Sequence, residues 1–213
     1  FFSWIDEKIR EKLKNVQLEE LEYGKDNDTI RDILLLHNIQ TMLNNENETT
    51  KFPFDRYKKE KWDIEHIHAI VSEVKVEKDK LDCWLKENFV ENEKHNDGDK
   101  NEKIKEIIEK GNSIDESEVE EIIHYVLGEE DNSLENLCLL DRSTNRAYKN
   151  DSFKAKRKEI IEREKEGKFI PICTKNVFLK YYSESVKSLE FWDESDKEKY
   201  FENINEVLKE YLQ

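Results

Sequence analysis

The chain has 213 residues, of which 41% are charged, and its formal net charge at pH 7 is −15. That length is enough for one sizeable core or for one domain with a subdomain, and the few Pro and Gly residues favour a mostly helical protein. Three widely spaced cysteines without a Cys-x-x-Cys pair argue against a disulfide framework and a structural zinc ribbon, and favour a reducing, cytoplasmic location. The sequence contains no apolar run of membrane-spanning length and no signal peptide, so no membrane partner is expected.

The negative charge is distributed unevenly along the chain. Residues 71–135 carry a net charge of −12, whereas residues 136–187 carry +6. Phosphate contact depends on local charge, so the second segment is a candidate nucleic-acid surface, the alternative being an ordinary helix of mixed charge. The chain begins at Phe1 rather than Met, and we therefore expect it to be a piece of a longer protein.

Helical periodicity dominates the N-terminal part. Apolar residues recur at helical spacing over residues 4–15, and Thr29 is the expected N-cap of an apolar helix that runs over residues 30–43. His37 lies within this apolar run, and we interpret it as a packing histidine rather than a ligand. Residues 52–54, Phe-Pro-Phe, predict an extended entry to the next element.

A first short strand is expected over residues 62–67, where apolar and polar residues alternate. From residue 71 the chain becomes an acidic, Lys/Glu-rich segment with helices expected at 101–110 and at 115–127, the second ended by Gly128. This segment therefore predicts a helical insertion.

A second strand is expected over residues 134–140. Asp151 or Ser152 can then cap a basic helix that runs to about residue 164. The remaining helices are expected after Thr174, as a cap, and over residues 196–212.

These elements predict a mainly α protein with a small β-hairpin. The hairpin would join two strands that lie about 70 residues apart in the sequence. The expected parts are an N-terminal helical part (1–61), a core (62–70 and 134–187), an acidic helical insertion (71–133) and a C-terminal helix (188–213).

Two stretches carry a family resemblance. They read WDIEHIHA over residues 62–69 and ENLCLLDRSTNRAYKNDSFKAKR over residues 135–157. The Glu-His pair, the nine-residue Asn-to-Asn step and the Asn-x-x-Phe-x-x-x-Arg tail together resemble the HNH, or ββα-metal, nucleases, in particular the C-terminal domain of GmrSD-type modification-dependent restriction proteins. The likeness covers roughly residues 30–183. It implies a ββα-metal core embedded in a helical domain with a long helical insertion.

The resemblance also implies roles for individual residues. His66 would be the general base that activates a water for attack on phosphorus, which suits a histidine because its unperturbed pKa lies near neutral. Glu65 and Asn145 would bind a divalent cation, and these hard oxygen ligands favour Mg²⁺ or Mn²⁺ over Zn²⁺. The cation would stabilise charge on the phosphate. Asn136 is expected to tie the hairpin together, and Asn150 to support the metal loop.

Basic residues beside the second motif are expected to contact DNA. Lys154 and Arg157, three positions apart, would share a helix face that can hold phosphate oxygens, and Arg146 would add to this surface.

Two features depart from the family pattern. His68-Ala69 replaces the usual proline-containing continuation, and the acidic insertion is long for a minimal HNH unit. His66 and His68 also form a His-x-His pair, whose rings would point to one face of a strand, so a zinc site is an alternative.

The resemblance implies a metal-dependent HNH endonuclease domain that cleaves DNA within a larger bacterial restriction or anti-phage protein. A nucleotide-hydrolysing domain would lie N-terminal to Phe1. The alternative is a catalytically inactive HNH-fold module used for DNA binding or subunit scaffolding. The two differ in whether Glu65, His66 and Asn145 converge on one cation.

Overall fold

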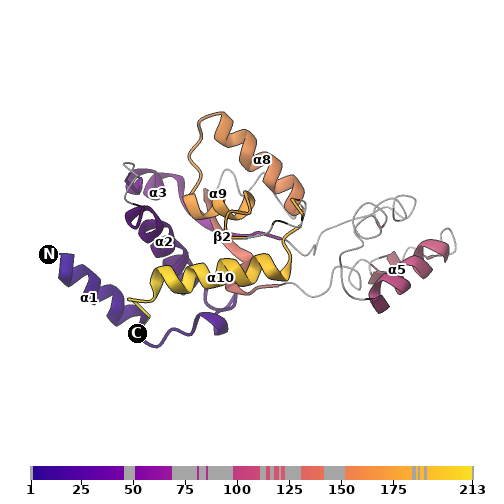
Figure 1. Cartoon of the computed structure of the whole chain (residues 1–213), viewed down its shortest axis with the longest axis horizontal. Coiled ribbons are helices and arrows are strands. Elements are labelled where there is room, and N and C mark those ends of the chain that lie inside the picture. The colour runs from indigo at the N-terminus through magenta and orange to yellow at the C-terminus, as the bar shows by residue number, and fades with distance from the viewer. Residues whose placement is uncertain are drawn as a thin grey trace. The chain divides into compact units, whose positions relative to one another are not determined.

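The computed structural model describes residues 2–45, 51–68, 98–110, 131–141, 152–183 and 191–212, with a few isolated positions between them. Over these residues the protein is mainly helical with a small two-stranded antiparallel sheet (Figure 1), which confirms the predicted secondary-structure class. The chain divides into two compact units. One unit comprises Phe1–Ala69 with Asp131–Gln213, and the other comprises Ile70–Glu130.

The sheet joins strands that lie far apart in the sequence. β1 (Trp62–His66) pairs with β2 (Leu137–Asp141), so that Trp62 lies opposite Asp141 and His66 lies opposite Leu137. The strand predicted from residue 134 begins three residues later, because Leu134–Asn136 forms a 3-10 turn, η5, that is closed by a bond from Asn136 N to Ser133 O.

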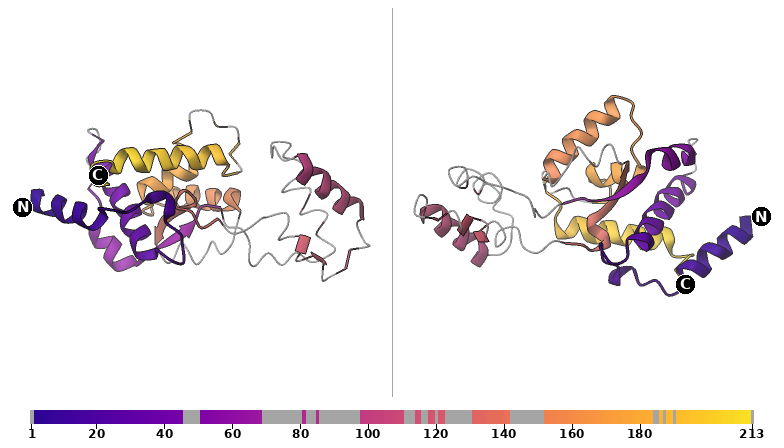
Figure 2. Two further views of the ribbon diagram at one scale, coloured as in Figure 1. Left: turned by 90° about the horizontal axis from the view of Figure 1, so that it is seen from below. Right: turned by 180° about the vertical axis from the view of Figure 1, so that it is seen from behind.

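Helices surround the hairpin in the first unit. α2 (Asn27–Leu43) packs against both strands, and α9 (Ile172–Phe178) packs against β2, as the views in Figures 1 and 2 show. α10 (Glu194–Leu208) packs against α2 and η5, and α8 (Phe153–Lys165) packs against α9. α1 (Phe2–Leu13) precedes these helices in the chain.

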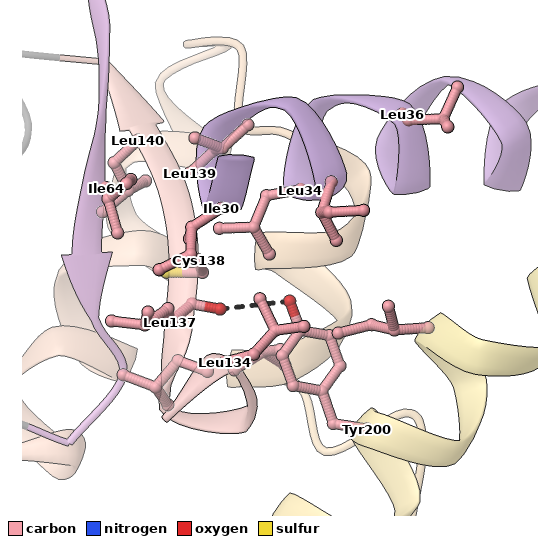
Figure 3. Close-up of a cluster of buried hydrophobic side chains, with 14 of the residues drawn as sticks. Ile30, Leu34, Leu36, Ile64, Leu134, Leu137, Cys138, Leu139, Leu140 and Tyr200 are labelled. Atoms are coloured by element: carbon pink, nitrogen blue, oxygen red, sulfur yellow. Dashed lines mark hydrogen bonds between the residues drawn. The ribbon is translucent and has the colours of Figure 1, made fainter. Parts of the chain in front are cut away.

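The apolar faces of these elements meet in one core, part of which is drawn in Figure 3. Tyr200 of α10 is buried there, and its hydroxyl donates a hydrogen bond of 3.2 Å to the main-chain oxygen of Leu137. This bond provides a partner for the polar atom that the large ring brings into the core. The other labelled core residues are Ile30, Leu34, Leu36, Ile64, Leu134, Cys138, Leu139 and Leu140.

The burial of His37 confirms the prediction that it is a packing residue. It is fully buried on α2, and its Nε2 lies 2.8 Å from Oδ1 of Asn203. Burial lowers the pKa of His37 to about 4, although the bond to Asn203 acts in the opposite direction.

Two predicted helix caps are wrong. α2 begins at Asn27 after Asp26, so Thr29 lies inside the first turn. Thr174 likewise lies inside α9, which begins after Pro171, and its hydroxyl donates to the main-chain oxygen of Leu139 at 2.6 Å. Proline also precedes α3 (Phe54–Glu60), a helix that was not predicted because the proline indicated extended chain.

Other helix boundaries agree with the sequence pattern. Ser152 caps α8 by accepting a hydrogen bond from Ala155 N at 3.3 Å, as predicted, and Asp151 lies outside the described residues. α10 begins two residues before its predicted start, because Asp193 and Asp196 form a reciprocal capping box.

The second unit has a small apolar cluster of its own. α5 (Gly98–Lys110) contributes Ile104 to this cluster. The predicted helix at 115–127 is helical at residues 118, 119, 121 and 122 but not at Asp115, and its other residues lie outside the described part of the chain. The buried residues of this apolar cluster are Leu81, Leu85, Ile104, Ile114 and Val119. Over all the residues that the structure describes, no helix has the length and apolar character needed to cross a membrane.

Candidate functional site

The hairpin brings the first motif against the start of the second. Glu65 lies opposite Cys138 in the register, and His66 lies opposite Leu137, which directly follows Asn136. Elements that are separated in sequence by the whole second unit thus meet at this end of the sheet.

The Glu65 carboxylate faces α8, where it forms an ion pair with Lys156. Its Oε1 accepts a hydrogen bond of 2.6 Å from the Lys156 ammonium, which also donates to the main-chain oxygen of His66 at 2.7 Å. The side chain of Glu65 is 12% exposed, and that of Lys156 is 0% exposed. The buried ammonium of Lys156 therefore connects α8 to the end of β1.

Lys156 was missed in the sequence because most charged residues of a basic helix are solvated. A signal was nevertheless present, since Lys156 stands between Phe153 and Ile160 at helical spacing, and all three residues are buried.

The imidazole of His66 is held in place by two residues that the sequence did not indicate. Its Nε2 lies 2.9 Å from Oδ1 of Asn132, and the Tyr23 ring stands edge-on to it at 4.9 Å between centroids. An amide oxygen only accepts hydrogen bonds, so Nε2 carries the proton and Nδ1 of the neutral ring carries the lone pair. Asn132 is fixed in turn, since its main-chain oxygen accepts from Tyr23 N at 2.9 Å.

Asn136 bridges the two chain segments that flank the second unit. Its Oδ1 accepts from His68 N at 3.0 Å, while its Nδ2 donates to His68 O and to Asp131 O, both at 2.8 Å. The residue is 1% exposed. All of these contacts are to the main chain, so its side chain organises the backbone around His66.

Several predicted site residues lie outside the described part of the chain. These residues are Asn145, Arg146 and Asn150, so the distance between Glu65 and Asn145 stays a prediction. Lys154 and Arg157 both lie in the first half of α8. Lys154 is exposed, whereas Arg157 is half-buried.

The described side chains alone do not fit a divalent cation. Among them, no group of three or more His, Cys, Asp or Glu residues is placed to hold a metal ion. Glu65 is already paired with an ammonium, and the zinc alternative would need further donors beside His66 and His68. A Mg²⁺ or Mn²⁺ site at Glu65 would therefore need ligands from outside the described residues, as predicted for Asn145, and a rearrangement at Lys156.

Cys138 does not offer a nucleophile at this end of the sheet. Burial, and then the negative charge of Glu65, raise the pKa of its thiol, so it stays protonated. The chemistry that the described residues offer is thus that of an oriented imidazole beside a carboxylate that is paired with an ammonium.

A separate cavity of about 460 Å³ lies at the other end of the hairpin. Asp141, which pairs with Trp62, is part of its wall, so it is distinct from the Glu65–His66 end. Its lining consists of Arg56, Glu60, Asp141, Arg163, Gly167, Lys168 and Phe169.

Comparison of the chain with models of protein families, with curated proteins and with solved structures gave no match.

Proposed function

We propose that β1, β2 and α8 form the core of an HNH-type nuclease that hydrolyses phosphodiester bonds in DNA. The observation that supports this most is the pairing of β1 with β2, together with the contact of Lys156 on α8 with Glu65 and the His66 carbonyl. Strand, strand and helix follow in the order that the HNH motifs imply. They meet at the Glu-His pair on which the chemistry would depend.

In this proposal His66 is the general base. A water aligned with Nδ1 gives up a proton to the ring as its oxygen attacks phosphorus. The bond from phosphorus to the departing oxygen breaks, and that oxygen takes a proton from a second water. Asn132 and Tyr23 hold the ring so that Nδ1 is the basic atom. A divalent cation, Mg²⁺ or Mn²⁺, would stabilise negative charge on the phosphate.

DNA would approach along the basic segment. Residues 136–187 carry a net charge of +6, and Lys154 is exposed near the start of α8. We further propose that the domain acts within a bacterial restriction or anti-phage protein, with a nucleotide-hydrolysing domain as its partner. This extension follows from the resemblance of the motifs.

A second candidate function is a catalytically inactive HNH-fold module that binds DNA or holds subunits together. The ion pair between Glu65 and Lys156 favours this alternative, because a carboxylate that already holds an ammonium is a poor ligand for a second cation.

A plasmid-nicking assay separates the two candidates. The wild-type protein and His66→Ala are compared with Mg²⁺ and with Mn²⁺, with EDTA as the metal-free control. Loss of a general base should slow nicking by about 10²–10⁴-fold. Lys209→Ala, an exposed residue at the C-cap of α10, is the matched control and should nick at the wild-type rate. Equal rates for wild type and His66→Ala would exclude His66 as the base, and a wild type inert with every divalent ion would favour the inactive module.

A further inference from the structure

Lys156 has an unusual environment for a lysine. Its side chain is wholly buried on the inner face of α8, between Phe153 and Ile160 along the helix. Burial of a charge is costly unless the charge is paired and hydrogen-bonded. The fold meets that cost with two oxygen acceptors, one from Glu65 and one from the main chain of His66.

Those two acceptors are of the kind that hold a hard metal ion. Carboxylate and main-chain carbonyl oxygens are ordinary ligands of divalent cations such as Mg²⁺ and Ca²⁺. Here the Lys156 Nζ lies 2.6 Å from the carboxylate oxygen and 2.7 Å from the carbonyl oxygen. The ammonium thus occupies the position of a cation between oxygens of the Glu-His pair.

A divalent ion on Glu65 would have to sit close to this ammonium. Like charges at such separations repel strongly, and burial weakens the screening by solvent. The positive charge of Lys156 therefore acts directly against cation binding at Glu65.

We propose that Lys156 excludes divalent cations from Glu65, and that a cation binds there only when the ammonium is displaced. The choice of Mg²⁺ or Mn²⁺ as the excluded ion rests on the proposed nuclease function, whereas the exclusion rests on the contacts of Lys156 alone. In this proposal the ion pair between Lys156 of α8 and Glu65 of β1 keeps the site free of metal. We call this ion pair the latch.

Mn²⁺ binding to the full chain tests this latch directly, with free Mn²⁺ followed by electron paramagnetic resonance. Lys156→Gln removes the charge but keeps an N–H donor for the two buried oxygens. It should bind Mn²⁺ at least about tenfold more tightly than the wild type, which corresponds to ~1.4 kcal/mol. The added substitution Glu65→Gln should abolish that gain. Lys158→Gln, an exposed lysine of the same helix, should leave the affinity unchanged.

A folded Lys156→Gln protein with the wild-type Mn²⁺ affinity would overturn the proposal. Should that variant fail to fold by circular dichroism, amine labelling of the wild type, read by peptide mass spectrometry, provides a second measurement. Wild-type protein that binds no Mn²⁺, or that binds it while Lys156 becomes reactive, agrees with the latch. Wild-type protein that is saturated with Mn²⁺ while Lys156 stays protected contradicts it.

Nicking assays on the same variants keep the two proposals apart. Tighter Mn²⁺ binding by Lys156→Gln without any cleavage would support the latch and count against the nuclease. Metal-dependent cleavage by the wild type, with unchanged affinity in Lys156→Gln, would support the nuclease and count against the latch.

Discussion

Asn136 binds both main-chain polar groups of His68 through one amide, accepting from its N–H at 3.0 Å and donating to its carbonyl at 2.8 Å. The same amide nitrogen reaches Asp131 O, also at 2.8 Å. A single buried side chain thus fixes the backbone on both sides of the gap between the two motifs.

Replacement of this amide should be costly. Asn136→Ala removes three hydrogen bonds and leaves their main-chain partners unsatisfied, so the free energy of unfolding should fall by about 2–3 kcal/mol. Urea denaturation followed by circular dichroism measures the loss. Asn205→Ala is the matched control, because Asn205 makes one bond within α10, to Phe201 O, and its loss should cost less than about 1 kcal/mol. Equal losses in the two variants would contradict a bridging role for Asn136.

The buried imidazole of His37 should make stability depend on pH. Its pKa is lowered from 6.5 to about 4, so between these values the unfolded chain binds more protons than the folded one. The contribution is fully present above pH 6.5 and is lost as the pH falls toward 4, with a total of about 3 kcal/mol.

His37→Gln, which does not titrate but can still bond Asn203, isolates this effect. Its free energy of unfolding should fall less steeply on acidification than that of the wild type, as measured by urea denaturation across this range. Parallel pH profiles for the two proteins would show that His37 does not carry the effect.

The buried pair of Lys180 and Asp196 should be sensitive to the loss of either charge. The Lys180 ammonium lies 5.1 Å from the centroid of the Phe153 ring and 5.3 Å from that of Trp192, and both charged residues are at most 4% exposed. Lys180→Met leaves the Asp196 carboxylate buried without its cationic partner, so it should destabilise the protein by about 3–5 kcal/mol.

The double variant Lys180→Met with Asp196→Asn should recover part of that loss, because it removes the unpaired charge. Lys199→Met, which breaks an exposed pair with Glu202, should change stability by no more than about 1 kcal/mol. Strictly additive losses in the thermodynamic cycle would exclude a coupled pair.

If the basic face of α8 binds DNA, the affinity for DNA should depend on salt concentration through Lys154 and Arg157. If Lys154 and Arg157 bind DNA phosphates, replacing both by Ala should reduce the slope of log affinity against log salt by about 0.9 for each phosphate that is no longer neutralised. Fluorescence anisotropy with a short DNA duplex at several salt concentrations measures this slope. Lys209→Ala, at the C-cap of α10, is the control. An unchanged slope in the double variant would leave Lys154 and Arg157 as ordinary surface charge.

The sequence was sufficient for elements whose signals are local. Alternation predicted β1, and Ser152 marked the start of α8, because a strand pattern and an N-cap are properties of neighbouring residues. The same local signal gave wrong N-caps at Thr29 and Thr174, because hydroxyl residues also occur inside the first turn of a helix. Thr174 instead donates its hydrogen bond to Leu139 in β2.

Contacts between distant segments could not be predicted in this way. Lys156 and Glu65 are 91 positions apart, and Asn132 lies 66 positions after His66. Contacts at such sequence separations produce no local sequence pattern, because the partners are brought together only by strand pairing and by the packing of α8. The family resemblance indicated His66 and Glu65, but it did not indicate the residues that hold them.

The bridge made by Asn136 also bears on how well the chain would tolerate replacement of its second unit. The carbonyl oxygens of His68 and Asp131 both lie 2.8 Å from one nitrogen, so the chain leaves the first unit and re-enters it at nearly the same point. A segment grafted between such closely spaced ends imposes little strain, and its closure entropy grows only slowly with length. Residues 70–130 should therefore be exchangeable for a short turn or for a foreign domain, with the host core left to fold around the same amide.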